Sequence, residues 1–492
     1  MQNLVTLIKS LSAGEEKLVR HFYKLRDFGE YRKRVQLLEL LFTAKAKDEN
    51  HLAQLLGFTA SSTAYHNVKS RLKSDIVCVL LMQESSCKFN TQYAQAMFSC
   101  RRALLTGEIL LSRGVYQEGI ALLRKASKLA EKYELYAERI ITEDALRNHY
   151  AGSSDLKELH SGTKEIDKNY ELLGQMMSSK KKLYQTVFSE SGSFNEDSPF
   201  RYNSEQLLDE LEKLDTGTES SRVSFYSKLS RLNVLHNRGE LTKAIECAKE
   251  LLVITEEDPV ITSSANQAGI HLEIANMYLR TANFQGAEIH AGKATDLFRS
   301  GMLNHLRACT IVFYAQVHAQ KYSEAESSLK LVLSSRCLKE PTYEILKNRI
   351  LLVSAWFSFA QGNFSHAATT LKQCAELGKE KGAWLFGFSI MESMLLIEKG
   401  AFDTALYKLD ALRKSVRLRK DSAVNRALLT ITLLRQLARC ANDYEELSKL
   451  ASREIEQLAL PASDAAWDPT GFEIVPIDHI VRARSRKKGL AV

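Results

Sequence analysis

The chain has 492 residues, a formal net charge of +8 and a hydrophobic share of 45%, enough apolar material for several globular domains or one long repeat array. No signal-peptide core opens the chain, and no apolar run reaches the roughly 18 residues that a membrane helix needs. The cysteines are scattered without a Cys-x-x-Cys pair, and prolines are few. We therefore expect a soluble, cytoplasmic protein with reduced thiols, rich in helix and without membrane contact.

The first 90 residues have the pattern of a small helical bundle. Apolar residues recur at helical spacing over residues 1–11, 15–25, 31–46 and 63–82. Ser12 and Glu15 have the spacing of a capping box at the start of the second of these helices. We interpret residues 1–90 as an N-terminal helical cap, because a repeat array has to cover the apolar face of its first unit.

The same segment permits a second interpretation, a DNA-binding helix-turn-helix. Ala53 and Gly57 have the small-residue spacing of that motif. The polar side chains that would face the DNA groove and phosphates are Tyr65, His66, Asn67, Lys69 and Arg71. However, the apolar stripe continues past the length of a recognition helix, and the polar face lacks the Arg, Asn and Gln side chains that read bases. Nucleic acid is therefore the less favoured partner.

Residues 91–196 begin with a repeat-like pair of long helices. The turn phrase Gly114–Tyr116 is followed by a small residue, Gly119, and a further long helix is expected over residues 156–188. The segment 189–203 is rich in serine, asparagine and acidic residues and contains the first proline. We expect a loop and a subdomain break there.

Residues 204–460 contain six copies of one helix–turn–helix phrase. In the clearest copy an apolar helix ends at Gly362, an aromatic residue, Phe364, follows two positions later, and Ala367 follows after three more. The equivalent anchors are Gly239, Ala282, Gln320, Gly362, Gly400 and Asn442, which lie 38–43 residues apart. The anchor ends the first helix in a tight or left-handed turn, the aromatic residue fills the space between the helices, and alanine lets their backbones approach. This period predicts a helical solenoid.

The phrase resembles the tetratricopeptide repeat, whose consensus has the same small–x–aromatic–x–x–Ala order within a unit of about 34 residues. The opening Leu7–Ser12, with Glu15, Lys17 and Phe22, also resembles the start of an uncharacterised bacterial family of tetratricopeptide-repeat proteins. The resemblance implies an all-α, right-handed superhelical solenoid of helix pairs, and it brings no established activity with it.

After residue 460 the helical pattern ends. Three prolines, Pro461, Pro469 and Pro476, break the remaining segment, which closes on the basic run Arg482–Lys488. We interpret residues 461–492 as a proline-containing basic tail whose end stays unfolded.

Sequence motifs for catalysis and for metal binding are absent. The sequence contains no glycine-rich phosphate loop, no His-Glu-x-x-His and no paired Cys/His spacing for zinc. We therefore expect no enzymatic activity, no cofactor and no metal site.

The first helix of each pair is expected to line a concave groove. Asn233 and Asn276 occupy the same place in successive repeats, where an amide can both donate to and accept from the backbone of an extended peptide. Nearby basic residues would supply charge-assisted contacts. The predicted partner-binding groove consists of Asn233, His236, Asn237, Asn276, Arg280, Arg307, Tyr314, His318 and Trp356.

These patterns predict a protein–protein interaction scaffold or adaptor that binds a partner peptide or helix in its groove. The alternative is a transcriptional or signalling regulator with a DNA-binding helical head and a repeat-based sensor region. A groove whose polar residues contact only water is the plainer alternative to peptide binding.

Overall fold

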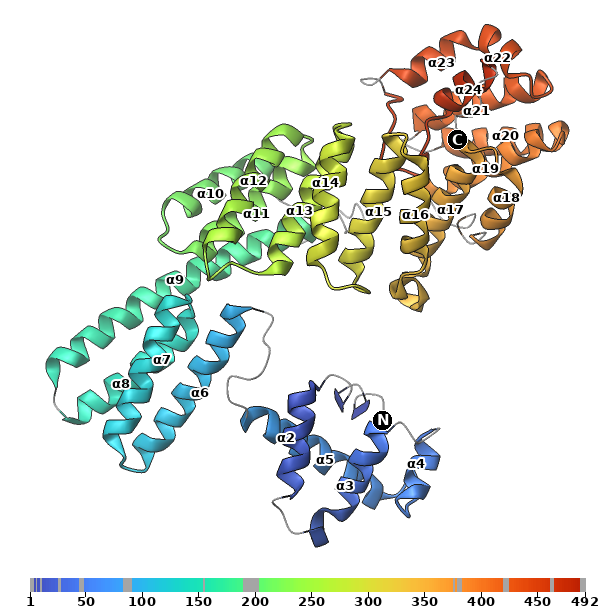
Figure 1. Ribbon diagram of the computed structural model, residues 1–492. Helices are drawn as coiled ribbons and strands as arrows, with labels where there is room; N and C mark the ends of the chain where they lie inside the picture. The colour runs from blue at the N-terminus through green and yellow to red at the C-terminus, as the bar shows by residue number, and fades with distance from the viewer. Residues whose placement is uncertain are drawn as a thin grey trace. The chain divides into compact units, whose positions relative to one another are not determined.

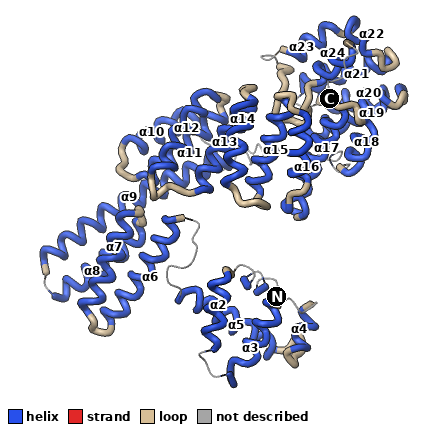
Figure 2. Tube along the Cα trace, in the orientation of Figure 1, coloured by secondary structure: helices blue, strands red, loops and turns tan. Residues whose placement is uncertain are grey.

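The computed structural model describes residues 4–5, 7–8, 11–24, 28–43, 48–82, 91–153, 155–188, 203–374, 377, 383–418, 424–460 and 464–486. Within these residues every regular element is a helix and no strand occurs (Figures 1 and 2). The predicted all-α fold is confirmed. The chain divides into two compact units, Met1–Thr163 and Lys164–Val492. The loop predicted at 189–203 lies, except for its last residue, outside the described residues.

The described residues of the first unit form two separate hydrophobic cores. One is formed by α2–α5 and includes Val19, Leu38 and Leu72, and the other is formed by α6–α8 and includes Cys100 and Leu123. The two cores share no residue, so residues 4–82 form a bundle of their own; its role as a cap stays a prediction. The helices are α2 (Ala13–Lys24), α3 (Phe28–Phe42), α4 (Glu49–Leu55), α5 (Thr63–Met82), α6 (Gln92–Ser112), α7 (Tyr116–Lys132), α8 (Tyr136–Ser153) and the first residues of α9 (Leu156–Phe188).

The capping box predicted at the start of α2 is confirmed. The backbone N–H of Ser12 donates to the Glu15 carboxylate over 2.6 Å, and the backbone N–H of Glu15 donates to Ser12 Oγ over 3.3 Å. These two bonds satisfy donors that the first turn of a helix leaves without intrahelical partners.

The second unit is a stack of helix pairs in sequence order. Most helices pack against the next one in the sequence, and the first helices of several neighbouring pairs also contact one another, as α13 does α15, α17 does α19 and α19 does α21. We call the first members of the pairs, α11, α13, α15, α17, α19 and α21, the A helices. The bounds are α10 (Ser204–Thr216), α11 (Ser221–Asn237), α12 (Leu241–Glu257), α13 (Ser264–Arg280), α14 (Phe284–Leu297), α15 (Leu303–His318), α16 (Tyr322–Leu333), α17 (Glu344–Ala360), α18 (Phe364–Gln373), α19 (Ala383–Glu398), α20 (Phe402–Arg417), α21 (Val424–Arg439), α22 (Tyr444–Leu450), α23 (Ser452–Ala459) and α24 (Ile477–Ser485), with 3-10 turns at Arg336–Lys339 and Pro341–Tyr343.

Every predicted anchor ends an A helix in the left-handed conformation. The backbone φ angles are 77° at Gly239, 58° at Ala282, 61° at Gln320, 82° at Gly362, 75° at Gly400 and 68° at Asn442. At Gly362 the following amide, of Asn363, donates back to the Ser358 carbonyl over 2.9 Å, the bond that closes a helix of this kind. The residue five positions after each anchor is fully buried: Ala244, Ala287, Ala325, Ala367, Ala405 and Leu447 are each 0% exposed. The anchor and the small residue of the repeat phrase therefore have the predicted roles, a left-handed helix end and a buried contact between helices.

Ala282→Gly is expected to stabilise the protein. Alanine at φ 58° carries a Cβ strain that glycine lacks, so the substitution should raise the free energy of unfolding by about 0.5–1 kcal/mol. The reverse change, Gly362→Ala, should lower it by a similar amount. Denaturant titration of the two variants measures both effects, and an unchanged or lowered midpoint for Ala282→Gly would show that the turn is not strained.

The segment after residue 460 differs from its prediction. Residues 464–486 are folded against the A helices, and α24 lies beside α22 and α23 (Figure 1). Ile477, Ile480 and Val481 are at most 1% exposed and belong to the main hydrophobic core of the unit. The expectation that the basic run Arg482–Lys488 stays unfolded is wrong for residues 482–486, because the apolar stripe of α24 gives this helix a face to bury. Residues 487–492 lie outside the described residues.

No helix in the described part of the chain has the length and apolar character needed to cross a membrane.

Candidate functional site

The candidate site is the face of α13, α15, α17 and α19 on which an irregular part of the chain lies. We call residues 464–475 the C-terminal loop. The Tyr314 hydroxyl donates to the Gly471 carbonyl over 3.1 Å, and His318 Nε2 lies 3.0 Å from the Pro469 carbonyl oxygen. The Trp467 ring packs edge-on against the His318 ring, with 4.7 Å between centroids. Two predicted groove residues therefore hold the chain's own loop through its backbone.

A third predicted groove residue, Trp356, is covered by the same loop. Trp356 is 0% exposed, and the Phe472 ring lies 5.9 Å from its ring centroid. Phe472 approaches α19 at Gly387, where a Cβ atom would lie only 2.4 Å from the Phe472 ring. Glycine at this position leaves the space into which the aromatic ring fits. The structure thus corrects the expectation of an open groove at Tyr314, His318 and Trp356.

A buried ion pair ties the end of the loop to α21. Arg426 Nε and one terminal nitrogen donate to the two Glu473 carboxylate oxygens over 2.6 and 2.9 Å, with side-chain exposures of 9% and 6%. The other terminal nitrogen of Arg426 donates to the carbonyls of Leu458 and Ala465. Asp478 lies 3.5 Å from the same guanidinium. This bidentate, desolvated geometry is the strong form of a charge-assisted hydrogen bond.

Burial beneath the loop lowers the pKa of His318 to about 4. Removal from water penalises the charged imidazolium more than the Pro469 carbonyl and the Asp468 carboxylate favour it. The neutral ring is therefore the form that the docked loop accommodates.

Acid is expected to weaken loop docking through His318. The folded pKa of His318, about 4, lies below the ordinary value of 6.5. The stability that the neutral His318 ring contributes is therefore complete above pH 6.5 and is lost as the pH falls towards 4. Between about pH 7.5 and pH 5 the loss should be about 1–2 kcal/mol. His318→Gln keeps a donor for the Pro469 carbonyl and should remove most of this dependence.

Tryptophan fluorescence during denaturant titration at the two pH values measures the effect, since Trp467 leaves the His318 ring when the loop undocks. The comparison is between variant and wild type, because burial also lowers the pKa of His290 to about 4. An equal pH dependence in both proteins would contradict the assignment.

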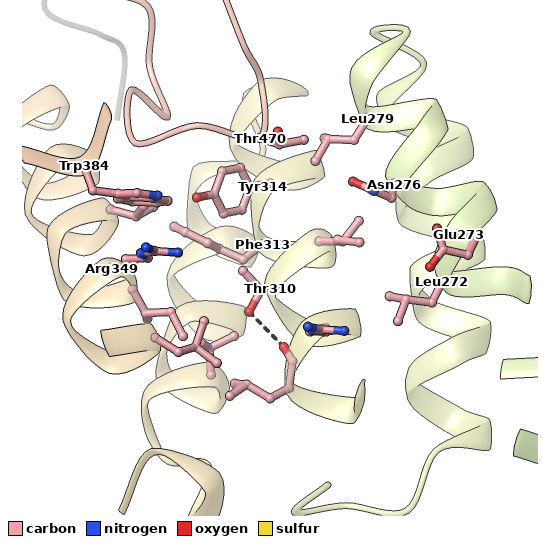
Figure 3. A pocket seen from close by; sticks show the side chains of 17 residues that line it. Leu272, Glu273, Asn276, Leu279, Thr310, Phe313, Tyr314, Arg349, Trp384 and Thr470 are labelled. Atoms are coloured by element: carbon pink, nitrogen blue, oxygen red, sulfur yellow. Dashed lines mark hydrogen bonds between the residues drawn. The ribbon is translucent and has the colours of Figure 1, made fainter. Parts of the chain in front are cut away.

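Beside the loop, the A helices enclose a cavity of about 340 Å³ (Figure 3). We call it the first cavity. Thr310, Phe313 and Tyr314 of α15 lie between Leu272, Glu273 and Asn276 of α13 on one side and Arg349 with Trp384 on the other, while Thr470 reaches it from the loop. Most of the lining is apolar, which is typical of a ligand pocket with a few polar groups that set orientation.

Two arginines give this cavity its positive charge. Arg307 is exposed and forms no ion pair within the described residues, and the Arg349 guanidinium lies over the Trp384 ring, 5.2 Å from its centroid. Among the described residues that line the cavity, Glu273 is the single acidic one. Asn276 and Arg307, both predicted groove residues, therefore border a real cavity.

Four other predicted groove residues, Asn233, His236 and Asn237 of α11 and Arg280 at the end of α13, do not border it. The Asn233 amide donates to Thr186 Oγ1 of α9 over 3.1 Å, so the first asparagine of the predicted clamp contacts the chain itself. The second, Asn276, is the one at the cavity. His236 Nε2 and Arg280 are 2.8 Å apart on neighbouring A helices, and Asn237 is exposed at the end of α11.

Only part of the predicted DNA-reading face of α5 is exposed. Tyr65 is 0% exposed in the core of the first bundle, which corrects the expectation that it faces a groove. Lys69 pairs with Glu49 over 2.5 Å, and that hydrogen bond lowers the pKa of the Glu49 carboxyl. His66, Asn67 and Arg71 are exposed.

Sequence reasoning missed the residues that hold the loop, which are Trp384, Gly387, Arg426, Phe472 and Glu473, and it missed that Arg484 holds α24 against other helices. The described residues contain no group of three or more His, Cys, Asp or Glu side chains arranged to hold a metal ion.

Fold and site together define an all-α helical-repeat protein whose A-helix face is partly covered by its own chain. The chain matches no protein-family profile and no protein of curated function. Among solved structures it is similar to a signal transduction ATPase with numerous domains (STAND) protein with a tetratricopeptide repeat sensor, from Pyrococcus horikoshii, at 12% identity and a TM-score of 0.33. The match covers 86% of this chain and 55% of that protein, so the chain spans about half of its length.

Proposed function

We propose that the protein is a non-catalytic adaptor that binds an extended segment of a partner protein on its A-helix face, at the first cavity. The observation that carries this proposal is the docked C-terminal loop. The A helices already bind an irregular, proline-containing stretch of polypeptide there. The Tyr314 and His318 side chains form hydrogen bonds to its backbone, and Phe472 fits against Gly387.

The chemistry of the first cavity supports a polypeptide ligand. An aromatic and aliphatic lining suits the side chain of a partner residue, and Asn276 offers an amide that can donate and accept at once. Arg307 and Arg349 favour a segment with acidic side chains. The loop borders the cavity through Thr470, so a partner segment bound there would lie beside the loop without displacing it.

Affinity capture with matched charge reversals tests the proposal. Arg307→Glu reverses the charge at the cavity, whereas Lys372→Glu reverses an exposed charge on α18, away from it. Proteins captured from native lysate by the wild-type chain, in the presence of nuclease, should be lost with Arg307→Glu and retained with Lys372→Glu. Retention of the same set by both variants would contradict the proposal.

The nuclease treatment separates this function from the alternative of a DNA-binding regulator. Capture through nucleic acid would disappear on nuclease treatment of the wild-type sample and would be insensitive to Arg307. It would also depend steeply on salt, because phosphate contacts release counterions.

A further inference from the structure

The long helix α9 carries a row of exposed apolar side chains on one face. Tyr170, Met177 and Tyr184 are 59%, 55% and 55% exposed, and they are seven residues apart, an interval that places them one above another on a helix. All three belong to the part of α9 that lies in the second unit. We call this row the α9 stripe. Tyrosine and methionine are enriched where proteins bind one another, so the stripe has the composition of an interaction surface.

A glycine lies within the stripe, between Tyr170 and Met177. A Cβ atom at Gly174 would meet no described atom within 4 Å, so no contact inside the described chain requires glycine there. Glycine in the interior of a helix is destabilising relative to alanine. On the stripe it leaves a gap between larger side chains, and a side chain of another helix can fit into that gap.

The charge beside the stripe changes sign along the helix. Asp167 and Glu171 are exposed at the N-terminal end of the stripe and Lys181 is exposed towards its C-terminal end, and none of the three forms an ion pair within the described residues. Lys168 and Lys182 already pair with acidic side chains of the second unit. Two such stripes therefore bring opposite charges together when their helices run antiparallel, and like charges together when they run parallel.

We propose that the α9 stripe binds a second copy of this chain, with the two α9 helices antiparallel about a two-fold axis between Gly174 and Met177. In this register Met177 of each copy fits against Gly174 of the other. Tyr170 and Glu171 lie level with Lys181 of the other copy, which gives a cation–π contact and an ion pair. A two-fold axis forms each contact twice and closes the assembly at two copies.

The length of the stripe sets the strength of the dimer. The face from Asp167 to Val187, which is also exposed, extends over roughly 30 Å of a helix about 10 Å wide. A strip of this size lies at the small end of specific protein interfaces. We therefore expect a dimer that dissociates in the micromolar range.

Sedimentation velocity of the full chain over a concentration series tests the proposal. The wild type should convert from monomer to dimer as its concentration rises. Met177→Lys places two charges near the axis and should weaken the dimer about tenfold or more. Leu331→Lys, at a side chain of α16 that is 54% exposed, should leave it unchanged. A monomer at every concentration up to the submillimolar range, or a dimer retained by Met177→Lys, would overturn the proposal.

Charge reversals test the direction of the helices. Lys181→Glu and Glu171→Lys should each weaken the dimer about tenfold, because each creates two like-charge contacts, and the double variant should recover the wild-type affinity. A double variant that is weaker than either single variant would refute the antiparallel register.

Methionine oxidation tests whether the same chain covers the stripe. In the monomer, hydrogen peroxide should oxidise Met177 faster than its buried neighbour Met176, which is 5% exposed, and dimerisation should slow the reaction at Met177. Equal protection of the two methionines in the monomer would mean that a segment of the same chain occupies the stripe, and it would overturn the proposal.

Discussion

Arg426→Ala is expected to destabilise the second unit by about 3–5 kcal/mol, the cost of leaving a buried charge without its partner. Glu473 and Asp478 are 5% and 1% exposed, and both depend on this guanidinium for compensation. Glu473 also accepts the Ile477 N–H at the start of α24 over 2.6 Å, so its displacement affects the helix as well as the loop. The loss appears as a lowered denaturation midpoint, with Trp467 fluorescence reporting the loop.

Arg439→Ala is the matched control for this prediction. Arg439 lies on the same helix, is exposed, and forms no ion pair within the described residues, so its removal should change stability by no more than about 0.5 kcal/mol. If the two alanine variants have similar midpoints, the buried pair does not hold the loop.

Arg484→Ala is expected to lower the free energy of unfolding by about 2–4 kcal/mol, because Arg484 joins α24 to four other helices, α17, α18, α19 and α22. Its guanidinium pairs with Glu398 and donates to the Tyr444 hydroxyl over 2.7 Å and to the Phe359 carbonyl over 3.1 Å. It also lies over the Phe359 and Phe364 rings, 4.7 and 5.0 Å from their centroids. Glu398 is 10% exposed and would keep its charge without a cation.

Lysine at position 484 should recover only part of this stability, since an ammonium group cannot make the forked contacts of guanidinium. Arg482→Ala, two residues away on the exposed side of α24, should have little effect. Thermal melts of the four proteins give the comparison. Equal losses for Arg482 and Arg484 would mean that the basic end of the chain acts only through its net charge.

The solenoid could be predicted from sequence because each repeat contains, within a few residues, the signals for its own helix–turn–helix. The anchor, the aromatic residue and the buried alanine lie within six residues of one another. A left-handed turn favours residues such as Gly362 or Asn442, and this preference can be recognised in a single repeat. The same repeat period predicted that Asn276 and Tyr314 lie on one face, and both line the first cavity.

The covered state of the groove could not be predicted in this way. Arg426 and Glu473 are 47 residues apart, and Tyr314 and Gly471 are 157 apart, so no periodic pattern connects them. Prolines and basic residues after residue 460 are typical of an unfolded tail. One signal pointed the other way: Ile477, Ile480 and Val481 have helical spacing, and an unfolded tail has no need of an apolar stripe.

Amide hydrogen exchange over residues 466–481, read by mass spectrometry on the intact chain, tests most directly whether this segment is part of the A-helix face. The account predicts that the amides of α24, together with the Ile477 N–H held by Glu473, exchange as slowly as those of α17 and α19. Exchange of the whole segment at the rate of an unfolded peptide, while α17 and α19 stay protected, would contradict it.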